Sequence, residues 1–231
     1  MYWMDVVENF NYLMKGLSVT LVVVFISVTG SMIAGTFFGI LRYLKIPVIS
    51  QIAAAYIESV RSIPLILFIV FIHFGITPYF LSIGDPKTVV LVSSCIAFTV
   101  FTSAYVAEII RSGLNSIEKG HIEAAKSLGL DTSQRLIHII LPIAITRMTP
   151  ALVSQFISLI KDTSLASAIG LIELTRAGEI IYERTYHETE ILIFIAFVYF
   201  IICFSLSKLS RLMEKKPYIS HETKEAILAN T

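Results

Sequence analysis

Residues Glu123 to Pro142, EAAKSLGLDTSQRLIHIILP, form a polar segment that is interrupted by glycine and lies between long apolar runs. The part before Gly129 is rich in the helix formers Glu, Ala and Lys, and Gly129 can take the left-handed conformation that ends a helix. Asp131 or Thr132 can then cap the next helix, which becomes apolar from Leu136 onward. The stretch therefore predicts a short helix, a turn and a second helix.

The composition of the chain is that of a membrane protein. Of its 231 residues, 55% are hydrophobic and 15% are charged, whereas soluble domains have about 45 to 50% apolar and about 25% charged residues. The net charge of +1 provides no basic excess for nucleic acid, so we expect no nucleic-acid partner. Cys95 and Cys203 lie inside apolar runs without a CxxC partner, and the histidines lack ligand spacing, so we predict no disulfide and no metal site.

Five segments are apolar enough to cross a membrane, which takes about 20 mostly apolar residues per helix. They are Leu17–Leu41, Ile63–Gly84, Thr88–Ala107, Met148–Ile172 and Ile191–Ser207. The fourth is irregular, because Lys161 and Asp162 stand in its middle. The expected fold is all-α, a polytopic membrane protein with five transmembrane helices.

The distribution of lysine and arginine predicts the orientation, because short cytoplasmic loops carry an excess of these residues. With the N-terminus outside, the cytoplasmic side receives Arg42, Lys45, Arg61, Arg111, Lys119, Lys126, Arg135, Arg147, Lys208, Arg211, Lys215 and Lys216. We therefore expect an extracytoplasmic segment over residues 1–16, a transmembrane domain over 17–211 and a cytoplasmic tail over 212–231. The polar region 118–142 then lies in the cytoplasm, and so does the C-terminus.

Two interpretations fit this cytoplasmic region when it is judged by pattern alone. A helix with the small residues Ala124 and Ala125 on one face can approach the groove of another protein closely, and Glu123 offers that protein a charge. The alternative is a solvated connecting loop, which every polytopic protein needs.

The spacing of the motif resembles a known family signature. Glu123-Ala124-Ala125, three residues, Gly129, nine residues, Ile139, one residue and Leu141-Pro142 match the EAA motif of the membrane subunits of ATP-binding-cassette importers. Further stretches are similar to the polar amino acid permease branch: GLSVTL (16–21), ESVRSIPLILFIVFIHFG (58–75), AYVAEIIRSGLNSIEKGHIEAAKSLG (104–129) and ISLIKDTSLASAIG (157–170). The resemblance covers nearly all of residues 16–211.

This resemblance implies a transport subunit in the plasma membrane of a bacterium. Such a subunit pairs with a second permease subunit, identical or not, and with two ATPase subunits and an extracytoplasmic amino-acid-binding protein. The helix with Glu123, Ala124, Ala125 and Gly129 would be the coupling helix that enters a cleft of the ATPase. The sequence has no G-x-x-x-x-G-K-[ST] motif, so we expect ATP and Mg to bind the partner ATPase. We expect no catalytic residue and no cofactor in this chain.

Asp162 is the main candidate for substrate binding. Inserting a charged side chain into a membrane costs roughly 2.5 to 3.5 kcal/mol, so a charge inside a spanning segment usually indicates a functional role. Gln155 lies about two helical turns earlier, and Ser158 lies between them on the same face. These side chains can bind the ammonium and other polar groups of an amino acid. Alternatively, Lys161 and Asp162 mark a helix end or pair with charges elsewhere in the dimer.

The expected function is that of a permease subunit for polar amino acids, working by alternating access. The alternatives are a permease subunit for another small solute such as an osmolyte, a secondary carrier driven by an ion gradient, and a membrane scaffold without a transport path. A secondary carrier would favour paired inverted repeats, which the sequence does not display. We also predict intrahelical ion pairs between Glu58 and Arg61 and between Glu108 and Arg111.

Overall fold

A computed structural model describes residues 2–80 and 85–214, and no strand occurs in these two ranges. The elements are α1 (Met4–Glu8), α2 (Phe10–Tyr43), α3 (Ile49–Ser62), α4 (Leu65–Val70), the π-helix η1 (Phe71–Ile76), α5 (Thr77–Phe80), α6 (Pro86–Asn115), α7 (Lys119–Ser127), α8 (Thr132–Arg135), the π-helix η2 (Leu136–Ile140), α9 (Leu141–Asp162), the 3-10 helix η3 (Thr163–Ile169), α10 (Leu174–Thr185) and α11 (Glu188–Glu214). The predicted all-α class is confirmed.

The number of candidate membrane spans, four or five, includes the predicted five. Four helical stretches are long and apolar enough to cross a membrane: Phe10–Tyr43, Pro86–Asn115, Thr132–Ile169 and Glu188–Arg211. A fifth crossing is available if α3 and the following helix, Leu65–Tyr79, form one span that is bent by 106°. The protein is therefore a multi-pass membrane protein with four or five crossings.

The second span differs in form from the uninterrupted stretch Ile63–Gly84 that its apolar sequence predicts. Helix α4 begins only at Leu65, since Pro64 has no N–H and disfavours helical geometry in the residue before it. Ile63 is accordingly extended, with φ −94° and ψ 133°. Residues 81–84 of the predicted span lie outside the described residues.

The fourth span is displaced toward the N-terminus relative to its predicted bounds, Met148–Ile172. A helical stretch runs from Thr132 through α9, so Pro150 lies inside the helix rather than at the start of the span. Asp162 is the last residue of α9, and η3 follows it. Lys161 and Asp162 thus stand at a change of helix type rather than in the middle of one regular helix.

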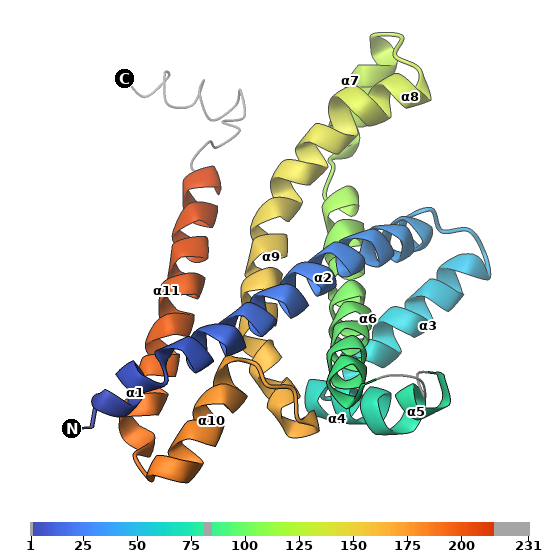
Figure 1. The fold of residues 1–231 in the computed structure, drawn as a ribbon. Coiled ribbons are helices and arrows are strands. Elements are labelled where there is room, and N and C mark those ends of the chain that lie inside the picture. Colours follow the sequence, from blue (N-terminus) through green and yellow to red (C-terminus); the bar gives the residue numbers. More distant parts are fainter. Residues whose placement is uncertain (1, 81–84, 215–231) are drawn as a thin grey trace, which may run out of the picture.

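Helices α2 and α6 form the centre of the fold, where the long α2 crosses α6 (Figure 1). Most of the buried residues of α2 are small and recur every three or four positions: Leu13, Gly16, Thr20, Val23, Ser27, Ser31, Gly35 and Gly39. Such residues let helix backbones approach closely within a membrane. A Cβ at Gly35 would lie 2.6 Å from the Cβ of Val106.

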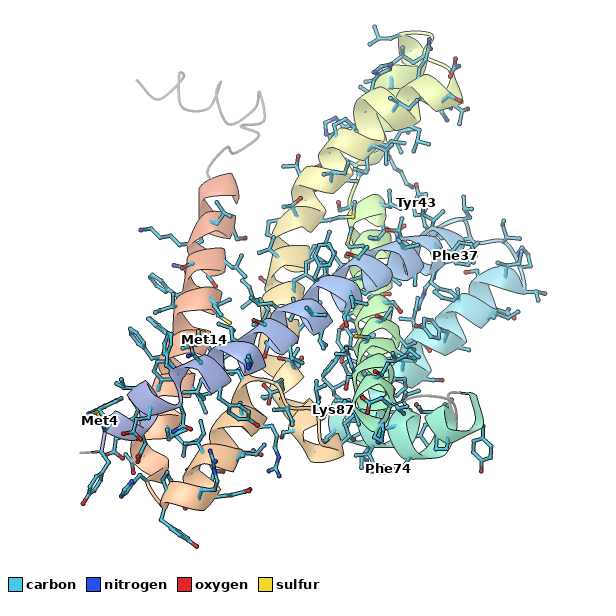
Figure 2. All side chains as sticks on the ribbon, viewed as in Figure 1. Met4, Met14, Phe37, Tyr43, Phe74 and Lys87 are labelled. Atoms are coloured by element: carbon cyan, nitrogen blue, oxygen red, sulfur yellow. The ribbon has the colours of Figure 1, made fainter. Side chains whose placement is uncertain are left out.

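The two ends of the molecule carry different elements (Figure 1). Helices α7 and α8 project at one end, whereas α1 and α10 lie at the other. The labelled side chains agree, because Tyr43 lies toward the α7 end and Met4 toward the opposite end (Figure 2). Helix α11 runs from the α10 end back toward the level of α7. Helix α1 and the end of α11 therefore lie toward opposite ends of the molecule.

Candidate functional site

The corner between α7 and α8 has the geometry that its sequence predicts. Gly129 has φ +76°, in the left-handed region. The N–H of Gly129 donates to the Lys126 carbonyl at 2.9 Å, and the N–H of Leu130 donates to the Ala125 carbonyl at 3.2 Å. These two hydrogen bonds form a Schellman motif, which satisfies the last carbonyls of α7.

The start of α8 is capped by Asp131 rather than by Thr132. The Asp131 side chain accepts a hydrogen bond from the N–H of Gln134 at 2.9 Å, and the Gln134 side chain accepts one from the N–H of Asp131 at 2.9 Å. This reciprocal pair is a capping box. Arg135 adds a hydrogen bond of 2.9 Å to the Leu130 carbonyl. The turn is therefore held by its own residues and presents a rigid corner.

The outward face of α7 differs in one respect from the predicted pair of small residues. Glu123 and Ala124 are exposed, but Ala125 is 2% exposed and faces inward. Leu128, one turn after Ala124, is 80% exposed. We call Glu123, Ala124 and Leu128 the α7 ridge. A single exposed apolar side chain does not indicate a partner by itself, but here Leu128 and Ala124 stand beside the charge of Glu123 on the exposed side of α7.

The predicted substrate residues lie together on α9. Because α9 is helical from Leu141 to Asp162, Gln155, Ser158 and Asp162 share one face, and all three are half-buried. Within the described parts of the chain, no hydrogen bond and no ion pair engages any of the three side chains. Their polar groups are therefore available to a ligand or to a residue of another subunit. The α7 ridge belongs to a separate site at the end of the molecule.

Charged side chains join α2, α3 and α6 at the end near α7. The predicted pair of Glu108 and Arg111 is present, with a hydrogen bond of 2.9 Å from Arg111 Nε. The prediction that Glu58 pairs with Arg61 is wrong. Glu58 instead binds Arg42 at 2.8 Å, and the Arg61 guanidinium lies over the Tyr105 ring, 5.2 Å from its centroid. These partners lie on different helices, so spacing along one helix does not reveal them.

The opposite end is fixed by a buried carboxylate that the sequence analysis missed. Glu173 is fully buried at the start of α10, where its side chain accepts hydrogen bonds from the N–H groups of Thr175 and Arg176, both at 2.8 Å. The Tyr199 hydroxyl donates to it at 3.0 Å. Burial raises the pKa of the Glu173 carboxyl, although these hydrogen bonds oppose the change. Glutamate is not among the preferred N-cap residues, so the sequence pattern carried no signal for this role of Glu173.

The described residues hold no group of three or more His, Cys, Asp or Glu side chains placed to bind a metal ion. Cys95 is buried in the core and Cys203 is half-buried, and the two are not bridged.

Comparisons with known proteins agree with this architecture. The chain is 44% identical over 210 residues to a probable glutamine ABC transporter permease protein of Bacillus subtilis (strain 168), covering 90% of this chain and 94% of that protein. It is 34% identical over 217 residues to a glutamate/aspartate import permease protein of Escherichia coli O157:H7, with 93% and 97% covered. Both alignments span almost the whole of each chain.

A solved structure and a family of transport proteins also match this chain. The fold matches the crystal structure of an amino acid ABC transporter with histidines, with a TM-score of 0.84, 33% identity, and 94% of this chain and 99% of that chain covered. Residues 27–217 match the family described as the binding-protein-dependent transport system inner membrane component. The chain therefore belongs to this family, and it is a transmembrane permease subunit of an ABC transporter.

Proposed function

We propose that this chain is the permease subunit of an ATP-driven importer for polar amino acids and works by alternating access. The observation that carries the proposal is the rigid α7–α8 corner, which projects from the bundle (Figure 1) and carries the exposed α7 ridge. The relatives are described as permeases for glutamine and for glutamate and aspartate, and this favours amino acids over an osmolyte. Their family also favours ATP over an ion gradient as the energy source.

The proposed partners follow from what this chain provides. Two ATPase subunits bind ATP and Mg, and one of them receives the coupling helix of this chain, formed by Glu123, Ala124, Ala125 and Gly129. Exposed Glu123 and Ala124 make the contact, and buried Ala125 supports the helix from behind. A second permease subunit, identical or not, completes the membrane path, and an amino-acid-binding protein docks at the α10 end. Closure of the ATPases on ATP moves the coupling helices together, and the spanning helices open toward the binding protein.

The proposed orientation places the α7 end in the cytoplasm and the N-terminus outside, in the plasma membrane of a bacterium. The excess of lysine and arginine at residues 111–147 supports it. The domain organisation is then an extracytoplasmic segment (1–16), a transmembrane domain (17–211) with the coupling region 118–142, and a cytoplasmic tail (212–231). Residues 215–231 of this tail lie outside the described residues.

The proposed substrate site is the polar stripe on α9. Asp162 binds the substrate ammonium, and Gln155 and Ser158 bind its other polar groups. The half-burial of the stripe and its lack of partners in the described residues support this role, since an unpaired polar group on a spanning helix is costly unless it serves a function.

The test is uptake into vesicles that contain the complete complex with its binding protein. Uptake of labelled glutamine or glutamate that requires internal ATP is the expected result. Uptake of a betaine osmolyte in place of amino acids would overturn the substrate class. Uptake driven by a sodium or proton gradient without ATP would overturn the energy source.

A further inference from the structure

Two cavities follow one side of α6, where α2 packs against it. The first, of about 250 Å³, lies near the start of α6 beside the loop 170–172, and Lys87 and Leu91 are among the residues that line it. The second, of about 490 Å³, lies farther along α6, and its lining runs from Leu91 to Val100. Because Leu91 lines both, the two cavities are adjacent. We call them together the α2–α6 groove.

The residues of α6 that line this groove recur in pairs. The paired positions are 87–88, 91–92, 95–96 and 99–100. Residues four apart stack on one face of a helix, so these pairs form one continuous strip along α6. The strip begins with the ammonium of Lys87 and the hydroxyl of Thr88, and apart from Thr99 it is apolar from Leu91 onward. The groove therefore has one polar end and a long apolar part.

Close packing closes the apolar part at its far end. A Cβ at Gly30 of α2 would lie 2.7 Å from Thr99 Cγ2, so α2 and α6 touch there. From this crossing the two helices diverge toward the α10 end of the molecule (Figure 1). Ile26 of α2 and Ile96 of α6 line the space between them and are 44% and 41% exposed. The groove is therefore a wedge between two helices that is open on its outer side.

The length of the groove matches one leaflet of a bilayer. Helix α6 has 30 residues and is about 45 Å long, and a bilayer with its headgroups measures about 40 to 45 Å. The start of α6 thus lies at the level of the headgroups, and Figure 2 shows Lys87 toward the end opposite Tyr43. Val100 follows Lys87 by roughly 20 Å of helix. The groove therefore reaches from the headgroups to about the middle of the bilayer.

The polar end of the groove offers donors that the rest of the chain does not use. Lys87 and Thr88 are exposed. Within residues 2–80 and 85–214, the Lys87 ammonium forms no ion pair and the Thr88 hydroxyl forms no hydrogen bond. Asp85, the nearest carboxylate along the chain, is not among the residues that line the groove. An ammonium beside a hydroxyl suits a phosphate, which lysine binds as a point charge.

We propose that the α2–α6 groove binds one anionic phospholipid of the leaflet at the α10 end, with its phosphate on Lys87 and Thr88 and one acyl chain along the apolar part of the strip. Charge complementarity and depth select this occupant, because a phospholipid carries an anion and a long apolar chain in the same order as the groove. The bound lipid fills the wedge and links α2 and α6 to Leu171 of the following loop. The inference does not depend on which solute is transported.

The experiment uses the complete complex, purified and placed in nanodiscs of phosphatidylcholine, to which phosphatidylglycerol with the same acyl chains is added in steps. The measurements are the number of phosphatidylglycerol molecules retained by the complex, from mass spectrometry, and the thermal unfolding temperature. We expect one tightly retained molecule per copy of this chain and a rise in the unfolding temperature. Glycerol 1-phosphate, which has the phosphate but no acyl chain, should produce no rise.

The polar end is tested by Lys87→Met, which removes the charge and keeps a long side chain. We expect the affinity for phosphatidylglycerol to fall about fivefold, the contribution of one lysine near a membrane surface. The matched control is Lys208→Met, at an exposed lysine near the other end of α11 that lines neither cavity. This control should keep the native affinity.

The apolar part is tested by two variants that fill it from opposite walls. Ile26→Trp acts from α2 and Ile96→Trp acts from α6, and each should abolish the tight retention of phosphatidylglycerol. The matched control is Ile33→Trp, at a residue of α2 that is 71% exposed and does not line the groove, and it should retain the lipid. Having one variant on each helix keeps the test valid if either fails to fold.

The outcomes separate this inference from the proposed function. A native complex without tightly retained phosphatidylglycerol overturns the inference, and so does native affinity in Lys87→Met. Retention that survives in both groove variants assigns the lipid to another surface and overturns it as well. If both groove variants instead lose the second permease subunit, the groove is a contact between subunits and not a lipid site. Because none of these measurements involves uptake, a complex that imports no amino acid overturns the proposed function alone.

Discussion

Asp131 and Gln134 each accept a hydrogen bond from the other's backbone N–H, both at 2.9 Å, and so close the turn that follows α7. This capping box and the positive φ of Gly129 fix the angle at which α7 leaves the bundle. A helix that transmits motion between subunits needs such a rigid base. If the turn were flexible, movement of the ATPase would bend the turn and would not move the spanning helices. The structure of the corner therefore agrees with the coupling role proposed for α7.

Gly129→Val should weaken coupling between ATP hydrolysis and transport. A Cβ at Gly129 would meet no atom within 4 Å, so space does not restrict the residue at this position. The restriction is the backbone φ of +76°. Left-handed geometry costs a β-branched residue about 1 to 2 kcal/mol, so the turn should open. Transport and co-purification of the ATPase should both fall. Gly129→Asn is the control, because asparagine tolerates this geometry. Native coupling in the valine variant would contradict the docking geometry.

Asp162→Asn should leave assembly intact and change the affinity or the selectivity of transport. The substitution removes the charge and keeps the shape, and the described residues offer Asp162 no ion-pair partner that would be left behind. The measurements are the yield of the complex and the concentration dependence of uptake. If Asp162 instead pairs with a buried charge of another subunit, yield falls first, because breaking such a pair costs about 3 to 5 kcal/mol.

Gln155→Glu should shift preference toward cationic amino acids. A second carboxylate would then stand about two turns from Asp162 on the same half-buried face of α9. The measurement is competition by lysine or arginine against labelled glutamine. Unchanged selectivity in a fully assembled complex would mean that this face does not contact substrate.

Glu173→Gln should remove a pH dependence of stability. Burial raises the pKa of Glu173 above its ordinary 4.5, so the folded state binds the proton more tightly than the unfolded state. The resulting stabilisation is fully present below pH 4.5 and is lost as pH rises through the folded pKa. Thermal unfolding across this range should therefore slope downward more steeply for the native complex than for the glutamine variant. Parallel curves would contradict a raised pKa.

Gly35→Ala should destabilise the bundle by roughly 1 to 3 kcal/mol, the usual cost of overpacking. The added Cβ would lie 2.6 Å from the Cβ of Val106, so α2 and α6 must move apart. Gly120→Ala is the matched control, since nothing lies within 4 Å of a Cβ there. The measurement is the thermal unfolding temperature of the purified complex. Equal temperatures for both variants would contradict the close helix contact.

Local features of this protein were predictable from the sequence. Gly129 and Asp131 form the turn through atoms only a few residues away, so short-range rules were sufficient. The spanning segments were also readable, because a membrane requires length and apolarity from each helix separately. The stripe of Gln155, Ser158 and Asp162 followed from the helical period alone.

The sequence by itself thus determined the all-α class, the approximate positions of the spanning stretches and the turn before α8, but not the bend in the second span or the bounds of the fourth. The tertiary structure decided which residues the long charged side chains bind and which side chains are buried. Glu58 binds Arg42 rather than Arg61, and Ala125 faces inward while Ala124 faces out. Spacing along one helix states only which side chains are neighbours on that helix. Which of them is buried or paired depends on the helix that packs against it, and that contact brings together residues far apart in the chain.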